Sequence, residues 1–116
     1  MKIVLYLSVI IAIVSGCKTN KSVGIELPEL MADSLKKVTK VQCETGLALY
    51  RENCSRCHTD TVKGREVIPD FSSDQLSNYE FRFANRKHEE QLSEAKLTQD
   101  ELVLIITFLS YKKKNK

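Results

Sequence analysis

Two cysteines and one histidine stand within a single stretch of five residues, Cys54-Ser55-Arg56-Cys57-His58. The whole chain of 116 residues holds only four cysteines and two histidines, so half of these side chains are gathered here. A chain of this length has room for one domain with a small core. The chemistry of this cluster therefore constrains what the domain can fold around.

Three kinds of site use such a cluster. Cys-x-x-Cys-His is the attachment signature of a c-type haem, because two thiols three residues apart form thioethers on one side of the porphyrin and the histidine binds the iron. A thioredoxin-like redox pair would need flanking strands, and sustained strand alternation is absent from the sequence. A structural zinc site needs four ligands, which Cys43 and His88 could complete. We predict haem, with zinc and a chance match as the alternatives.

The N-terminus predicts export. Lys2 precedes an apolar run that ends in small residues before Cys17, and this run is too short for a comfortable membrane-spanning helix. We therefore predict a signal peptide over residues 1–16, with an uncleaved anchor as the alternative. The stretch "VSGC" resembles the lipobox of bacterial lipoproteins, which implies that Cys17 is the lipidated first residue of the mature protein.

Export agrees with the haem motif, since this attachment takes place beyond the inner membrane. The expected location is the periplasmic side of a bacterial membrane, and Lys18 in place of an aspartate favours the outer membrane. Residues 17–40 are polar and are expected to form a tether, in which "LPELMADSLKK" could be a short helix. Without the C-terminal "KKKNK", the mature chain has 13 basic and 15 acidic side chains, which argues against a nucleic-acid partner.

Three helices are expected from the apolar periodicity, which makes the domain all-α. The first follows Val41, and the last covers "LTQDELVLIITFLSYKKK", where Thr98 and Glu101 match a capping box. Leu102, Ile105, Ile106 and Leu109 form its apolar stripe. A third helix is expected over residues 72–92, capped by Ser73 or Asp74, after a loop that contains Gly64 and Pro69.

Gly46 lies inside the first expected helix, where a glycine costs roughly 1 kcal/mol relative to alanine. Close approach of another helix is the natural explanation. The last helix is the candidate partner. Cys43, on the inner face of the first helix, is expected to be a small buried hydrophobe, with redox sensing or intermolecular pairing as the alternative.

The pattern Gly46-x-x-Leu49-Tyr50-x-x-x-Cys54-x-x-Cys57-His58 resembles the start of a class I (mitochondrial-like) c-type cytochrome, and Phe108-Leu109 resembles the aromatic-leucine pair of its closing helix. The resemblance covers residues 41–116. It implies that the N- and C-terminal helices cross at Gly46, that one haem c is attached through Cys54 and Cys57 as the core, and that His58 is the proximal ligand. It also implies that the carbonyl of Pro69 accepts a hydrogen bond from His58. The residues expected to line the haem are Ile68, Phe71, Leu76, Tyr79 and Phe83.

The family usually supplies a methionine as second axial ligand, but here Met1 and Met31 both precede the haem motif. His88 is the obvious replacement, and bis-histidine ligation lowers the reduction potential relative to histidine and methionine. A five-coordinate or water-bound iron remains an alternative, as does ligation by Gln91, Lys87 or Met31.

The expected function is that of a tethered monohaem cytochrome that carries single electrons between redox proteins and is not itself an enzyme. Its partner would be a haem protein, a copper protein or an oxidoreductase in the same compartment. The alternative is a haem sensor with an open distal site for a gas ligand.

Overall fold

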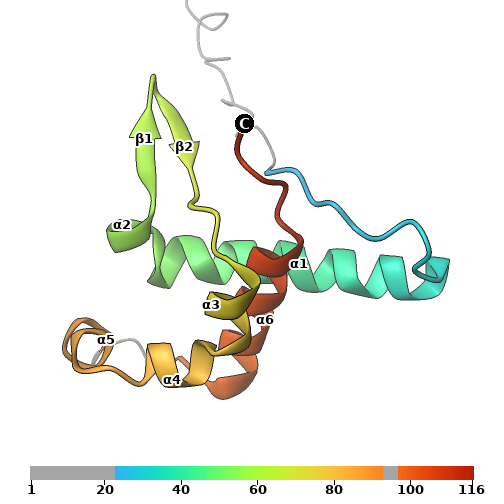
Figure 1. Ribbon diagram of the computed structural model, residues 1–116. Coiled ribbons are helices and arrows are strands. Elements are labelled where there is room, and N and C mark those ends of the chain that lie inside the picture. Colours follow the sequence, from blue (N-terminus) through green and yellow to red (C-terminus); the bar gives the residue numbers. More distant parts are fainter. Residues whose placement is uncertain (1–22, 93–96) are drawn as a thin grey trace, which may run out of the picture.

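The computed structural model describes residues 23–92 and 97–116 as a small, mostly helical domain (Figure 1). The predicted signal peptide, Cys17 and the first residues of the predicted tether lie outside the described residues. Within the described ranges, no helix is both long enough and apolar enough to cross a membrane. The elements in chain order are α1 (Asp33–Asn53), α2 (Ser55–His58), β1 (Asp60–Val62), β2 (Arg65–Val67), α3 (Ser73–Ser77), α4 (Tyr79–Phe83), α5 (Arg86–Gln91) and α6 (Gln99–Tyr111).

The N-terminal helix α1 packs against the C-terminal helix α6, as predicted. Cys43 and Tyr50 from α1, with Ile105 and Phe108 from α6, are the largest fully buried side chains. The rings of Tyr50 and Phe108 meet at a centroid distance of 5.9 Å. A Cβ atom on Gly46 would lie 2.9 Å from Phe108 Cβ and would overlap the backbone of α6, so the predicted close approach is confirmed.

The beginning of α6 follows its sequence signal. Thr98 is the N-cap, its hydroxyl accepts a hydrogen bond from the Glu101 backbone N–H, and the Glu101 side chain accepts one from the Thr98 N–H. The predicted capping box is therefore confirmed. Leu102, Ile105 and Leu109 of the predicted stripe are buried, and Ile106 is partly buried.

The N-terminal part of the described chain is folded rather than extended away from the domain. Helix α1 begins at Asp33, inside the segment expected as a tether, and residues 24–26 lie beside residues 111–113. The Glu26 N–H donates to Tyr111 O at 2.8 Å, and the Lys113 N–H donates to Gly24 O at 2.9 Å. The apolar side chains of Val23 and Ile25 pack on the core, which explains why this polar-looking segment folds back.

A hairpin replaces part of the predicted loop, so the all-α expectation is wrong in this detail. β1 pairs antiparallel with β2, with Val62 opposite Arg65. Lys63 and Gly64 turn the chain with φ angles of 51° and 72°, the conformation of a two-residue hairpin turn. Arg51 of α1 holds the hairpin through two hydrogen bonds to the Glu66 carboxylate, the shorter 2.7 Å.

The predicted helix over residues 72–92 is broken into α3, α4 and α5. Ser72, rather than Ser73 or Asp74, is the N-cap of α3 and forms a capping box with Gln75. The breaks occur at Asn78 and Asn85, whose side-chain amides donate to the backbone carbonyls of Asp74 and Arg82. An asparagine side chain that bonds to nearby backbone groups competes with the hydrogen bonds of a helix. The chain therefore changes direction twice between α3 and α5.

Candidate functional site

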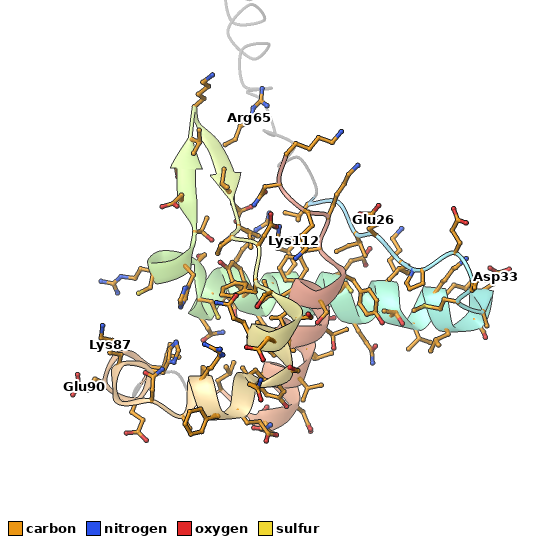
Figure 2. The ribbon with its side chains drawn as sticks, in the orientation of Figure 1. Glu26, Asp33, Arg65, Lys87, Glu90 and Lys112 are labelled. Atoms are coloured by element: carbon orange, nitrogen blue, oxygen red, sulfur yellow. The ribbon has the colours of Figure 1, made fainter. Side chains whose placement is uncertain are left out.

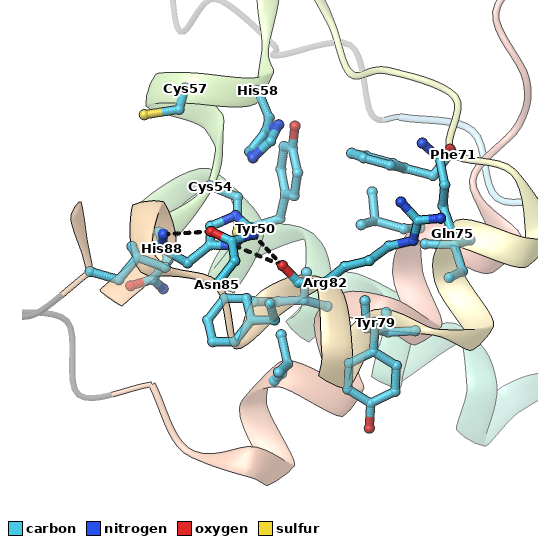
Figure 3. A pocket seen from close by; sticks show the side chains of 18 of the residues that line it. Tyr50, Cys54, Cys57, His58, Phe71, Gln75, Tyr79, Arg82, Asn85 and His88 are labelled. Carbon is cyan, nitrogen blue, oxygen red and sulfur yellow. Dashed lines mark hydrogen bonds between the residues drawn. The ribbon is translucent and has the colours of Figure 1, made fainter. Parts of the chain in front are cut away.

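A cavity of about 740 Å³ lies between α2, the segment α3–α5 and α6 (Figure 3). Its volume is within the roughly 300–1,000 Å³ of sites that hold cofactors and small ligands. Cys54, Cys57, His58 and His88, the four residues predicted to serve the haem, all line it. The apolar wall is formed by Phe71, Leu76, Tyr79, Phe83, Leu92, Leu102, Ile105, Ile106 and Leu109.

Four of the five predicted wall residues line this cavity. The exception is Ile68, which is only 3% exposed and belongs to the core cluster beside Tyr50 and Phe108. Pro69, which follows it, is half-buried, and its predicted role as acceptor for His58 stays a prediction.

The cysteine-histidine motif forms one tight turn at the end of α1. The Cys54 N–H closes that helix by donating to Tyr50 O at 2.8 Å, and the Cys57 and His58 N–H groups then both donate to Cys54 O, at 3.2 and 3.0 Å. This turn brings the two cysteines and the histidine to the same edge of the cavity. A hydroxyl–hydroxyl hydrogen bond of 3.0 Å joins Tyr50, which precedes the turn, to Thr59, which follows it.

The two cysteines of the motif have different surroundings. Cys54 is partly buried, and this burial, with a smaller effect from Cys57, raises the pKa of the Cys54 thiol to about 11. Cys57 is exposed at the cavity edge. Cys54 is therefore a neutral thiol at physiological pH and a poor nucleophile.

The imidazole rings of His58 and His88 face each other across the cavity. Their centroids are 6.0 Å apart, with 36° between the ring planes. An aromatic ring supports each of them: Phe71 meets His58 edge-on at 6.1 Å, and Phe83 stacks on His88 at 5.0 Å. Figure 3 shows both histidines on the cavity side of their helices.

His88 is positioned by the break before α5. The Asn85 side chain caps this helix by accepting a hydrogen bond from the His88 backbone N–H at 3.1 Å. His88 Nδ1 lies 3.3 Å from Arg82 O, and a carbonyl can only accept, so this contact favours a proton on Nδ1. The Nε2 atom then carries the lone pair that a metal ligand needs.

The spacing of the two rings fits an iron bound between them. If one nitrogen of each ring points at the same metal, two metal–nitrogen bonds of about 2 Å place the two ring centres about 6 Å apart. The observed distance is 6.0 Å. With two cysteines at one edge and an apolar wall, these residues fit a covalently attached haem.

A bare metal ion fits less well. In residues 23–92 and 97–116, no three His, Cys, Asp or Glu side chains converge closely enough to hold one. Cys43, which the zinc alternative needs, is fully buried, and its thiol faces Thr107 O of α6 at 3.9 Å. A porphyrin supplies four of the iron's ligands itself, so a haem needs only one or two from the protein.

Two further candidates for the distal ligand do not line the cavity. Lys87 is exposed and Met31 stands before α1, and neither is among the residues around the two histidine rings. The side chain of Gln91 lies outside the described part of the chain. Arg82 and Asn85, which the sequence analysis did not single out, also line the cavity. The capping role of Asn85 could have been predicted, because an asparagine three positions before His88 is a common helix N-cap.

No protein-family model, no curated protein and no solved structure matches the chain. The function is therefore inferred from the residues and geometry of the cavity.

Proposed function

We propose that this chain is a membrane-tethered, monohaem c-type cytochrome of class I, which carries single electrons between periplasmic redox proteins. Cys54 and Cys57 would hold the haem through thioethers, and His58 and His88 would be the two axial ligands. Cys17 would anchor the mature chain through its lipid. The haem, when bound, supplies the one-electron redox chemistry, while the protein sets potential and access.

The observation that carries this proposal is the pair of facing imidazoles, 6.0 Å apart, in a cavity bordered by both cysteines. Residues 30 positions apart in the sequence reach this geometry because Asn78 and Asn85 break the intervening helix. The apolar wall supports the same conclusion, since a porphyrin is a large apolar plate that buries well against leucine, isoleucine and aromatic side chains.

Electron transfer is favoured over gas sensing because His58 and His88 would both bind the iron. An iron with histidine on both faces has no open position for a gas ligand, whereas a sensor requires one. Bis-histidine ligation also implies a lower reduction potential than ligation by histidine and methionine. The partner is accordingly a protein that exchanges one electron at low potential.

The test is an optical spectrum of the haem-matured protein, ferric and ferrous, before and after addition of CO. We expect haem that stays attached after denaturation, a low-spin spectrum and no response to CO. His88→Ala should become high-spin and bind CO, while the matched control Lys87→Ala, changed at the adjacent and exposed position, should behave as wild type.

Two results would count against the proposal. Haem that separates from the denatured chain would remove the role of Cys54 and Cys57. A wild type that already binds CO and is unchanged by His88→Ala would show that His88 is not a ligand, and the sensor function would then replace electron transfer.

A further inference from the structure

The two ends of the described chain are joined into one structure. Besides the backbone hydrogen bonds of residues 24–26 to residues 111–113, Ile25 and Lys112 form an antiparallel bridge. Figure 1 shows the beginning of the described chain beside the C-terminal segment, on one side of the helical body. The chain thus leaves the domain toward Cys17 from a fixed point.

The C-terminal segment is in turn fixed to the chain that follows the hairpin. Lys112 Nζ donates to Asp70 Oδ1 at 2.6 Å, and Lys114 Nζ donates to Phe71 O at 2.9 Å. The Asn115 side chain donates to Ile68 O at 2.9 Å. These contacts make residues 112–115 a defined part of the surface.

The hairpin and the C-terminus extend to the same side of the domain, away from α5 (Figure 1). In Figure 2, Arg65 lies on this side and Lys87 lies on the side of α5. Together the hairpin and the C-terminal segment present five basic side chains, which we call the terminal basic surface: Lys63, Arg65, Lys113, Lys114 and Lys116.

Few acidic groups oppose this charge. The Glu66 carboxylate is paired with Arg51 at 2.7 Å, and that of Asp70 is paired with Lys112. Glu26 and Asp60 are exposed nearby, so the five basic side chains exceed these two carboxylates. The surface has a net positive charge that adjacent anions would complement.

The distance to the lipid is short. Six residue steps separate Cys17 from Val23, which is the first described residue, and a fully extended chain covers about 20 Å over that length. A tether that ended at residue 40 would reach about 80 Å. The terminal basic surface therefore stays close to the membrane that holds the lipid.

We propose that the terminal basic surface binds anionic lipid headgroups and so orients the domain, with α5 turned away from the bilayer. This inference rests on the lipidation of Cys17 in the proposed function. Beside a lipid anchor, each lysine or arginine near an anionic surface adds an attraction of about 1 kcal/mol. The occupant is the anionic membrane surface, because the lipid already brings that surface within reach.

Lysine acetylation followed by mass spectrometry tests this on the full, lipidated, haem-containing protein. The protein is placed in vesicles of phosphatidylcholine alone or of phosphatidylcholine with phosphatidylglycerol. In the anionic vesicles, acetylation of Lys63, Lys113 and Lys116 should slow by about fivefold or more, the factor that corresponds to one basic contact with an anionic surface. Acetylation of Lys37, Lys40 and Lys87 should be unchanged.

Salt and a matched pair of variants complete the experiment. At 1 M salt, where the Debye length is about 3 Å, the protection should disappear. Arg65→Gln combined with Lys114→Gln should weaken the protection of the remaining lysines by about fivefold or more. Lys37→Gln combined with Lys40→Gln, which removes the same charge from α1, should leave it intact.

The outcomes separate the two proposals. A lipidated protein whose lysines react equally in both kinds of vesicle overturns the orientation and leaves the cytochrome function standing. If mass spectrometry shows that Cys17 carries no lipid, the membrane anchor of the proposed function is wrong, and the proposed orientation is overturned with it. The haem spectrum is recorded independently of both.

Discussion

The rings of His58 in α2 and His88 in α5 lie 6.0 Å apart, each supported by a phenylalanine. The short helix α5 presents His88 toward the cavity because Asn85 caps it and Arg82 O faces His88 Nδ1. An exposed histidine on a continuous charged helix would have neither contact. These contacts hold the His88 ring at the cavity, which a freely exposed surface histidine would not show.

The first prediction concerns the reduction potential. Replacing His88 with methionine should raise the potential of the haem, because thioether ligation raises it relative to imidazole. Redox titration of the visible spectrum measures the change. Lys87→Met adds the same side chain at the neighbouring exposed position and should leave the potential at the wild-type value. Equal potentials in all three proteins would mean that residue 88 does not reach the iron.

The second prediction concerns the crossing of α1 and α6. Gly46→Ala would place a Cβ atom 2.7 Å from the carbonyl carbon of Leu104, an atom of helix backbone that cannot move without shifting α6. The gain in helix propensity is roughly 1 kcal/mol, and the forced separation of the helices should exceed it. We expect a net loss of about 1–3 kcal/mol in the free energy of unfolding, measured with urea.

Thr45→Ala provides the control for that variant, since Thr45 is the adjacent exposed residue of the same helix. It should be as stable as wild type or slightly more stable. If Gly46→Ala matched it, the two helices would not be in contact at this position.

Much of the helical framework could be predicted because its signals are local. Thr98 and Glu101 mark the start of α6 within four residues, and Gly46 inside an otherwise regular helix indicates a close neighbour. The hairpin gives no comparable signal, because its strands are only three residues long and too short to show alternation. The return of residues 24–26 to the C-terminus depends on partners more than 80 positions away, which no local pattern records.

The residues of the candidate site also differ in how far the sequence could predict their positions. Cys54, Cys57 and His58 form one turn, so their sequence spacing already determines that they meet. The position of His88 depends on two breaks in the preceding helix, at Asn78 and Asn85, and on where the following turns direct α5. The sequence could propose His88 as a ligand, but the competition between asparagine side chains and the helix decided where its ring lies.

The third prediction concerns the ion pair of Asp70 and Lys112. The Lys112 side chain is 2% exposed, whereas that of Asp70 is 30% exposed. Asp70→Asn leaves a buried ammonium group without its counter-charge, while Lys112→Met leaves a carboxylate that water can reach. We expect Asp70→Asn to lose about 2–3 kcal/mol of unfolding free energy and Lys112→Met to lose less. Equal losses would contradict the difference in burial.

The same pair predicts a dependence on pH. Hydrogen bonding from Lys112, with a smaller contribution from the Asn115 backbone, lowers the pKa of Asp70 below its ordinary value. A carboxyl with a lowered pKa contributes stability above its unfolded pKa of about 3.9, and this contribution is lost as the pH falls through the folded pKa. Wild type should therefore lose more stability than Asp70→Asn between about pH 5 and pH 3, and parallel profiles in urea unfolding would contradict this.

The last prediction concerns Cys43, which is fully buried between α1 and α6. Burial is the main cause that raises the pKa of its thiol, and the charge of Glu44 adds to it. If Cys54 and Cys57 are thioethers and Cys17 carries lipid, Cys43 is the only thiol of the mature holoprotein. A thiol reagent should then find no reactive group in the folded protein and one after unfolding, at a rate that follows the population of opened molecules as urea is raised. Gln42→Cys, at the exposed neighbouring position, should react at once, and an equally fast reaction of wild type would show that Cys43 is not sealed in the helix interface.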